Sequence, residues 1–256
     1  MEIFDGQAAE YDAWYSTPEG RRLDALEKTA VWRAARPKAG ETALDVGCGT
    51  GNYSLALARR GLTVTGVDVS TDMLAAAERK ARGLESVKFM RADATALPFA
   101  PESFDLVLSV TAFEFVKDPA RAVSECWRVL RPGGRLVVAW IAGSGAWANL
   151  YEKAAAADEN SVFQRARFWT VAEARKWLPG ISPRIRGALW TPPLWLGKGT
   201  WGRFWIASVA ERIGRVIWVV LRRSPGGNDS DSAGCGWRQS FCPGFVVVRW
   251  DKKGER

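Results

Sequence analysis

The chain has 256 residues, 47% of them hydrophobic, with a formal net charge of +8 and no histidine. A chain of this size can bury one large core, so we expect a single domain spanning residues 1–256. The lack of histidine excludes His-containing catalytic triads, a histidine general base and His-ligated zinc. 

The chain opens without a basic segment followed by an apolar run, which predicts no secretory signal and a cytoplasmic location. Two helices are expected first, at 7–15 and 18–36, and the second has an apolar face through Leu23, Leu26, Ala30 and Val31.

Beyond a turn at 37–40, short apolar runs alternate with helical patterns. Strands are predicted at Thr42–Val46, 63–67, Val87–Arg91, 104–109 and 136–141, and helices at 52–60, 71–82 and 118–130, the last stopped by the Pro-Gly-Gly of 131–134. This alternation indicates a doubly wound α/β domain with parallel strands. Ligands of such domains bind at the carboxyl ends of the strands.

After residue 143 the alternation of strand and helix patterns becomes less regular. Helices are predicted at 145–158, 171–178 and 200–223, strands at 184–190 and 244–250, and a Gly/Ser/Asp-rich loop at 224–236. Residues 151–256 hold 18 Lys/Arg against 9 Asp/Glu, and 11 of the 14 tryptophans lie between Trp140 and Trp250. This composition fits an anionic surface, and equally an Arg-rich solvated face over an aromatic core.

The predicted helix 200–223 is amphipathic, with apolar side chains on one face and arginines on another. Its longest apolar run, 216–221, is too short to span a bilayer. Three roles stay open for it: a cap over the substrate cleft, peripheral contact with an anionic membrane, or a partner interface.

Four cysteines are present. Cys48 and Cys126 fall in regular elements and are expected to pack as small apolar residues. Cys235 and Cys242 lie in the Gly-rich region, either as incidental thiols or as a disulfide or a soft-metal or arsenic site. No resident metal is predicted.

The main chemical motif is a strand that runs into a glycine-rich turn and then a helix. Gly47, Gly49 and Gly51 let the backbone bend sharply and approach a ligand, while NH groups at the helix start face it. Asn52 occupies the place where a dinucleotide fingerprint requires its third glycine, which argues against NAD or FAD.

Two acids follow the next strands. Asp68 lies at the tip of the second strand, where its carboxylate can accept hydrogen bonds from both hydroxyls of a ribose; alternatively it caps the following helix. Asp93 follows the third strand, where it and the Ala94 NH are suited to an adenine edge; alternatively Asp93 forms an Asx turn.

The segments LDVGCGTGNYS, GVDVS, RADATALPF, FDLVLSVTAFEFVKDP and RVLRPGGRLVVAW resemble successive motifs of class I S-adenosylmethionine-dependent methyltransferases. The resemblance is closest to the ubiquinone/menaquinone-biosynthesis type (methyltransferase type 11) and runs from about residue 4 to 142. It implies a Rossmann-like seven-stranded sheet of order 3-2-1-4-5-7-6, whose antiparallel strand is 244–250. The N-terminal lid helices would occupy 1–36, the cofactor-binding core 37–142, and the cap elements and last strands 143–256.

The same resemblance implies S-adenosylmethionine as cofactor and S-adenosylhomocysteine as product. The implied contacts are Asp45, Gly47, Gly49 and Gly51 around the methionyl part, Asp68 at the ribose, Val69 and Met73 flanking the adenine, Asp93 and Ala94 reading it, and Val110 near the sulfonium. Tyr11 and Tyr15, in a segment similar to the family's lid helix, either close over the methyl donor or serve packing alone.

The chain departs from its relatives after the fourth strand, where they often carry two histidines and this chain has Glu114 and Phe115. Glu114 could accept a substrate proton or pair with a cationic amine; alternatively it is an ordinary polar residue at a helix start. Methyl transfer needs no covalent intermediate, so positioning and water exclusion can supply most of the acceleration.

The sequence therefore predicts methyl transfer to a small-molecule or lipophilic acceptor, quinone- or lipid-like. An RNA- or tRNA-directed methyltransferase and a non-catalytic S-adenosylmethionine-binding protein are the alternatives. Nucleic acid is disfavoured, because no RNA-binding module is recognisable and Ser109-Val-Thr-Ala112 stands where a base-methylating motif would be.

Overall fold

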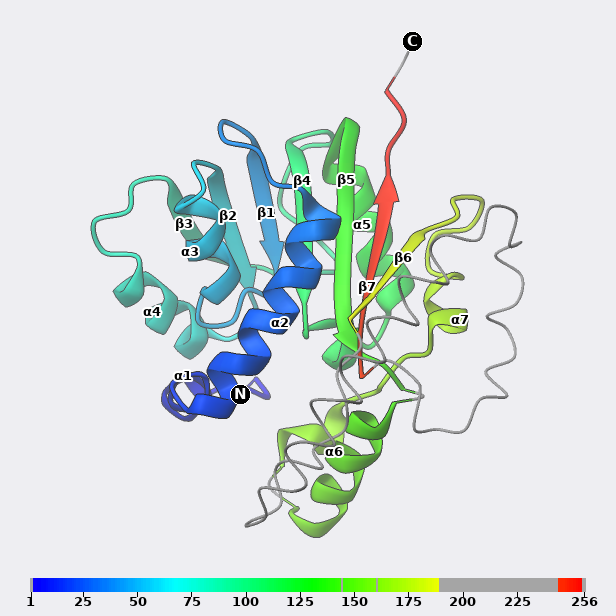
Figure 1. The fold of residues 1–256 in the computed structure, drawn as a ribbon. Coiled ribbons are helices and arrows are strands. Elements are labelled where there is room, and N and C mark those ends of the chain that lie inside the picture. Colours follow the sequence, from blue (N-terminus) through cyan, green and yellow to red (C-terminus); the bar gives the residue numbers. More distant parts are fainter. Residues whose placement is uncertain (1, 144, 160, 189–243, 255–256) are drawn as a thin grey trace. The chain divides into compact units, whose positions relative to one another are not determined.

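The computed structural model describes residues 2–143, 145–159, 161–188 and 244–254. Its strands form one seven-stranded sheet in the order β3-β2-β1-β4-β5-β7-β6 (Figure 1). The strands are β1 (Thr42–Val46), β2 (Thr63–Asp68), β3 (Val87–Arg91), β4 (Phe104–Val110), β5 (Leu130–Ile141), β6 (Arg184–Ala188) and β7 (Phe245–Asp251). The expected strand order is confirmed.

Strands β1 to β5 are parallel, with registers such as Leu44↔Thr65 and Leu44↔Val107. Strand β7 runs against β5: the NH of Gly133 donates to the carbonyl of Lys252 at 2.8 Å, whereas the NH of Ala142 donates to Gly244 at 3.1 Å. Early residues of one strand thus pair with late residues of the other, so β7 is the expected antiparallel insertion.

The described helices follow the predicted order. They are α1 (Ala8–Tyr15), α2 (Pro18–Ala35), α3 (Asn52–Ala58), α4 (Thr71–Lys80), α5 (Pro119–Val129), α6 (Ala146–Ala157) and α7 (Val171–Ala174), with short 3-10 turns η1 (Phe113–Phe115) and η2 (Val162–Arg165). Thr17, Ser70 and Asp118 cap the starts of α2, α4 and α5 through their side chains. These caps satisfy NH groups that have no partner inside a helix.

Two predicted boundaries are wrong. β5 begins at Leu130 and includes the Pro-Gly-Gly segment, because Gly133 and Gly134 exchange backbone hydrogen bonds with Lys252 of the neighbouring chain segment. α7 ends at Ala174, four residues early. Trp177 beyond it is buried, with ring centroids 5.5 Å from Phe113 and 5.4 Å from Trp140. Tertiary pairing and packing override local propensity in both places.

The described residues divide into two compact units. The first comprises residues of Met1–Trp140, Arg175–Arg186 and Val247–Arg256, and the second comprises the described residues of 141–174, 187–188 and 244–246. The predicted helix 200–223, the loop 224–236, Cys235 and Cys242 lie outside the described residues. Among the helices that are described, none has the length and apolar character needed to cross a membrane.

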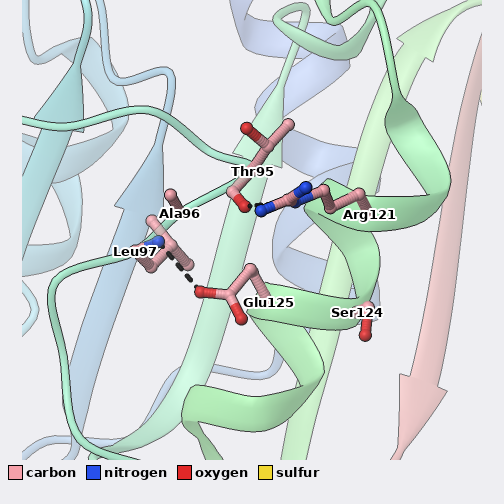
Figure 2. Close-up of a pocket in the computed structure, with 6 residues that line it drawn as sticks. All are labelled: Thr95, Ala96, Leu97, Arg121, Ser124 and Glu125. Carbon is pink, nitrogen blue, oxygen red and sulfur yellow. Dashed lines mark hydrogen bonds between the residues drawn. The ribbon is translucent and has the colours of Figure 1, made fainter.

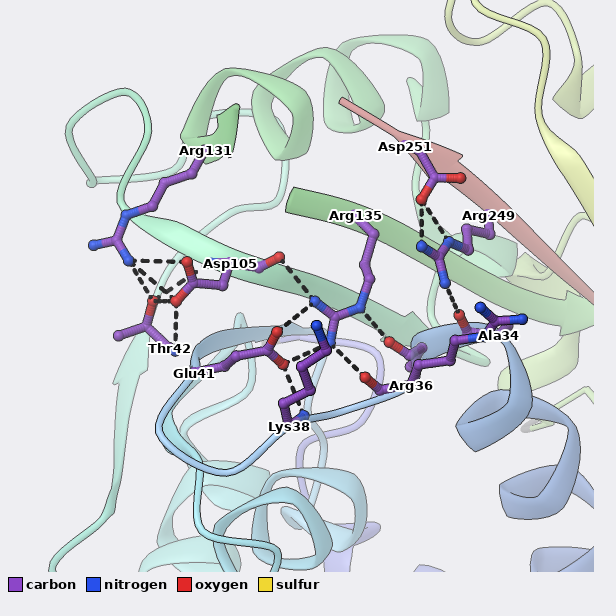
Figure 3. Close-up of polar contacts among 11 residues, drawn as sticks. Ala34, Arg36, Lys38, Glu41, Thr42, Asp105, Arg131, Arg135, Arg249 and Asp251 are labelled. Carbon is purple, nitrogen blue, oxygen red and sulfur yellow. Dashed lines mark hydrogen bonds and ion pairs between the residues drawn. The ribbon is translucent and has the colours of Figure 1, made fainter. Parts of the chain in front are cut away.

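The carboxyl end of α2 is fastened to the amino-end side of the sheet (Figure 3). Arg135, only 6% exposed, donates to both carboxylate oxygens of Glu41 at 2.9 and 2.6 Å. Arg135 also donates to the carbonyls of Ala35 and Arg36, and Arg249 donates to that of Ala34 at 2.7 Å. These carbonyls are last-turn acceptors without a helical partner, so α2 ends on a fixed anchor.

Candidate active site

The turn between β1 and α3 is built from glycines with positive φ: +70° at Gly47, +52° at Gly49 and +82° at Gly51. This backbone region favours glycine over residues with a side chain. A Cβ on Gly47 would lie 2.3 Å from the Cβ of Ala112, whereas a Cβ on Gly49 would meet nothing within 4 Å. Gly47 is therefore required by close packing, and the bare backbone at Gly49 borders space that a ligand can enter.

Asp68 closes this turn from the end of β2. One carboxylate oxygen accepts from the Gly49 NH at 2.8 Å and the other from the Ser70 NH at 2.9 Å. Burial raises the pKa of Asp68, and the backbone hydrogen bonds oppose that shift. Each oxygen of an ionised carboxylate has two acceptor positions, so Asp68 keeps capacity for two further donors, such as the two hydroxyls of a ribose.

The carboxyl end of β1 is fixed by two buried hydroxyls. Ser54 donates to the carboxylate of Asp45 at 2.6 Å, and Ser109 donates to the carbonyl of Val46 at 2.7 Å. Asp45 is 2% exposed, and burial raises its pKa to about 7. The site therefore contains an acid whose charge state is sensitive to a nearby cation.

The residues expected at the adenine lie around the ends of β2 and β3. The NH of Ala92 donates to the carbonyl of Asp68 at 3.0 Å, so Asp93 and Ala94 follow directly beside the Asp68 position. Val69 is 37% exposed, and Val110, at the end of β4, is buried.

Two of the expected adenine residues already have contacts of their own. Asp93 is exposed and accepts from both the NH and the hydroxyl of Thr95 at 2.8 Å, which is the Asx-turn arrangement. Met73 is buried in a cluster with Ala8 and Ala76, on which Phe4 and Tyr11 pack. The role of both residues at an adenine stays a prediction.

The N-terminal segment is held over the glycine turn (Figure 1). Asp12 of α1 accepts from the Thr50 hydroxyl at 2.6 Å and from the Lys80 ammonium at 2.8 Å. Asp5 accepts from the Ser70 hydroxyl at 2.8 Å. α1 thus contacts both the turn and α4, and its role as a lid stays a prediction.

Several buried or half-buried side chains that can ionise come from α1, α2 and η1. The hydroxyls of Tyr11 and Tyr15 are 3.3 Å apart. Glu27 of α2 and Glu114 of η1 are 7% and 2% exposed. Burial raises the pKa of Glu27 to about 8, and the charges of Asp24 and Glu114 add to the shift.

Sequence reasoning missed two residues of this group. Glu27 occupies the apolar face of α2, four residues after Leu23 and three before Ala30, so a charge at a core position was the available signal. Thr111, just after β4, has a φ of +49° and lies near Tyr11. Non-glycine residues in this conformation concentrate at functional sites, but nothing in the sequence marks this one.

A shallow pocket of about 460 Å³ lies elsewhere, between the loop after Asp93 and α5 (Figure 2). Its lining residues are Thr95, Ala96, Leu97, Arg121, Ser124 and Glu125, none of them a predicted site residue. Glu125 accepts from the Leu97 NH at 2.9 Å, and Arg121 donates to the Thr95 carbonyl at 3.0 Å. These groups tie the loop to the helix, so we assign the pocket a structural role.

The strand order, the glycine turn and the acid at the end of β2 define a Rossmann-like domain of the class I methyltransferase type. Residues 44–138 match the family described as "Methyltransferase domain". This match agrees with the motifs in the same residues, which resemble those of methyltransferases.

Several known proteins are similar to this chain. Demethylmenaquinone methyltransferase of Clavibacter sepedonicus is 44% identical over 136 residues, covering 53% of this chain and 55% of the relative. The Thermus thermophilus enzyme of the same name is 48% identical over 108 residues, covering 41% and 49%. The matches thus span about half the length of these relatives. 

A solved structure from Thermotoga maritima, described as a SAM-dependent methyltransferase and possible histamine N-methyltransferase, covers 98% of this chain and 99% of its own with a TM-score of 0.61. At 23% sequence identity, this likeness shows the fold alone.

Proposed function

We propose that this protein transfers a methyl group from S-adenosylmethionine to a small-molecule acceptor. The observation that carries the proposal is the hydrogen bond from the Gly49 NH to the Asp68 carboxylate at the ends of β1 and β2. This contact brings the bare glycine backbone beside an acid that keeps free acceptor positions, which supports binding of the methionyl and ribose parts of one ligand. The absence of a third glycine at Asn52 disfavours a dinucleotide.

In this proposal the remaining site residues keep the roles expected of them. Asp45, Gly47 and Gly51 surround the methionyl part, Val69 and Met73 flank the adenine, Asp93 and Ala94 read its edge, and Val110 lies near the methyl group. The bound donor would supply an electrophilic methyl carbon. The protein then needs only to align the acceptor, exclude water and receive a proton.

Three side chains are suited to those tasks. Tyr11 and Tyr15 of α1 cover the site and keep water out, consistent with their half-buried position. Glu114 is buried in the segment that follows β4 and can receive the proton that the acceptor loses.

For the acceptor we propose a quinone-like molecule. Two relatives with 44% and 48% identity are named demethylmenaquinone methyltransferases. The aligned part of this chain is about half of it, and the segments expected to bind the acceptor extend beyond that part.

The binding step is tested by titration calorimetry of the full chain with S-adenosylmethionine, S-adenosylhomocysteine and NAD. We expect both adenosyl ligands to bind and NAD not to bind. Tight NAD binding without binding of either adenosyl ligand would refute the proposal.

The transfer step is tested with methyl-labelled S-adenosylmethionine and reduced demethylmenaquinone carrying a short prenyl chain. Label should move to the ring, and the oxidised quinone is the matched control because it is a poorer nucleophile. Donor binding with no transfer to the reduced quinone would contradict the quinone assignment.

A further inference from the structure

The loop after β3 carries the two groups expected to read the adenine, and both keep bonding capacity. Thr95 donates its NH and its hydroxyl to the same oxygen of Asp93, Oδ1, both at 2.8 Å. Among the described residues, neither Asp93 Oδ2 nor the Ala94 NH has a hydrogen-bond partner. The Asx turn thus fixes the Asp93 side chain and leaves one acceptor and one donor for a ligand. The edge of adenine offers the complementary pair, because its N6 amino group donates and its N1 accepts.

This loop is held at both ends. At its start, the Ala92 NH donates to the carbonyl of Asp68, the residue expected at the ribose, at 3.0 Å. The Ala96 NH donates to the carbonyl of Asp93 at 3.0 Å and closes a turn. At its end, Leu97 is 4% exposed and is bonded to α5. The position of the adenine-reading groups therefore depends on both attachments.

The attachment at Leu97 is made by two side chains of α5. Glu125 accepts from the Leu97 NH at 2.9 Å (Figure 2), and Arg128 donates to the Leu97 carbonyl at 2.9 Å. Arg128 also donates to the Phe99 carbonyl at 2.7 Å. Both polar groups of the Leu97 backbone are thus bonded to one face of a helix.

Glu125 and Arg128 also hold each other. Arg128 donates to the two carboxylate oxygens of Glu125 at 2.8 and 2.7 Å, and this hydrogen bonding lowers the pKa of Glu125. A two-point contact of this kind fixes the orientation of both side chains. Their side chains are 33% and 20% exposed, and an ion pair of that exposure contributes little to stability by itself. Its remaining hydrogen bonds go to the loop backbone, so its main effect is on the geometry of the loop.

We propose that Glu125 and Arg128 are positioning residues for the adenine ring, because they fix the loop that directs Asp93 Oδ2 and the Ala94 NH at the edge of the ring. The inference rests on the proposed function. Neither side chain contacts the ligand in this proposal, since both act through the backbone of the loop. The specificity that they support is for a 6-aminopurine over a 6-oxopurine, whose oxygen and N1 hydrogen present the reverse pattern.

The test compares S-adenosylhomocysteine with S-inosylhomocysteine by titration calorimetry of the full chain. The two ligands differ only in the base, so the ratio of their dissociation constants measures reading of the base edge. The unmodified protein should prefer the adenosyl ligand by at least about 100-fold, as expected where a site hydrogen-bonds one pattern of donors and acceptors.

Arg128→Met and Glu125→Ala should each lower this preference by about tenfold, the effect of one misaligned hydrogen bond to a charged group. The adenosyl ligand should bind more weakly, and the affinity for the inosyl ligand should change little. Glu125→Gln keeps an acceptor for the Leu97 NH and should retain most of the preference. A role in stability alone would leave the preference unchanged, because it does not distinguish the two bases.

Two further variants complete the test. Lys28→Met removes the cation of the Asp24–Lys28 ion pair on α2, whose side chains are 24% and 21% exposed, and it should leave the preference unchanged. Arg121→Met removes an exposed side chain that donates to the Thr95 carbonyl at 3.0 Å, so it should fold and lower the preference by about threefold. Arg121→Met and Arg128→Met decide the question if Glu125→Ala does not fold.

The outcomes separate the two proposals. An unchanged preference in folded Arg128→Met and Arg121→Met, or equal weakening of both ligands, overturns the positioning role and leaves the proposed function standing. Equal binding of the two ligands by the unmodified protein also overturns it, because the loop then does not read the base. No binding of S-adenosylhomocysteine or S-adenosylmethionine refutes the proposed function itself.

Discussion

Asp68 links two parts of the site at the level of a single side chain. Its oxygens hold the NH of Gly49 in the turn and the NH of Ser70 at the start of α4. The same carboxylate therefore orders the backbone and keeps acceptor positions for a ligand. Losing it removes both effects at once.

Asp68→Ala should weaken S-adenosylmethionine binding by about 1.5 to 3 kcal/mol, because charge-assisted hydrogen bonds to the ribose are lost. Titration calorimetry measures the change, and far-UV circular dichroism checks the fold. Glu78→Ala, an exposed acid on α4, is the control and should leave affinity unchanged. An unaltered dissociation constant in folded Asp68→Ala would remove this residue from the site.

At the scale of elements, the first two helices, α1 and α2, are fixed by separate sets of contacts. The carboxyl end of α2 is fixed by Arg135 and Arg249, and α1 is fixed to the turn by Asp12. Glu27 lies between these two anchors, on the buried face of α2. Its position therefore depends on a network at the far, amino-end side of the sheet (Figure 3).

Arg135→Ala should lower the free energy of unfolding by about 3 kcal/mol, because it leaves Glu41 and two helix-end carbonyls without their buried partner. Urea denaturation measures the loss. Arg131→Ala is the matched control on the same strand: its side chain is 43% exposed and pairs with Asp105, so the loss should stay below about 1 kcal/mol. Equal losses of unfolding free energy in both variants would contradict the prediction that Arg135 contributes more to stability than Arg131.

Lys80 also holds α1, the proposed lid helix, in place. Its ammonium donates to Asp12 at 2.8 Å, to Thr50 at 2.9 Å and to Asn52 at 2.9 Å, so it joins α1, the glycine turn and α3. Lys80→Met should loosen α1 and speed dissociation of S-adenosylmethionine by about tenfold, as expected for loss of a charged hydrogen bond worth about 1.5 kcal/mol. 

Stopped-flow displacement of the bound donor measures this rate. Arg79→Met, at the exposed neighbouring position of α4, should leave the rate unchanged. If both variants release the donor at the original rate, α1 does not act as a lid.

For the whole molecule, two buried acids should govern how stability depends on pH. Burial raises the pKa of Glu27 to about 8 and that of Asp45 to about 7. In the unfolded chain both groups titrate near pH 4, at about their reference values. Between pH 5 and 7 the folded state therefore holds protons that the unfolded state has lost.

Stability from these two groups is complete below about pH 4 and is lost as pH rises towards the folded pKa values. The unfolding free energy of the ligand-free protein should fall by about 1.4 kcal/mol per pH unit for each group between pH 5 and 7. No histidine titrates in this window, and carboxyls with lowered pKa, such as Asp105 and Glu125, act below it.

Urea denaturation from pH 5 to 7 measures the slope, and Glu27→Gln and Asp45→Asn should each flatten it. The double variant should depend on pH less than either single variant, and the raised pKa of Asp68 accounts for a remaining slope. A stability that rises with pH would contradict the burial of both acids in protonated form.

The sequence by itself determined the sheet and the turn, and it predicted the cofactor class. Alternating apolar runs fix strands and helices locally, and the glycines at 47, 49 and 51 are each needed for a positive φ. Asp68 was found because parallel strands place their carboxyl ends together, so an acid at a strand tip is near the turn whatever the rest of the fold does. Helix starts at Thr17 and Asp118 follow from their own side chains.

Only the tertiary structure decided the partners of groups far apart in the chain. The sequence presents Glu27 as one residue of an amphipathic helix. Its raised pKa comes mainly from burial, then from Asp24 on the same helix and from Glu114, 87 positions later. The Gly133 and Gly134 segment predicts the end of the preceding helix. In the structure, backbone hydrogen bonds with Lys252 make this segment part of a strand. Burial and long-range pairing depend on which surfaces pack against each other in space. A local sequence pattern does not contain that information.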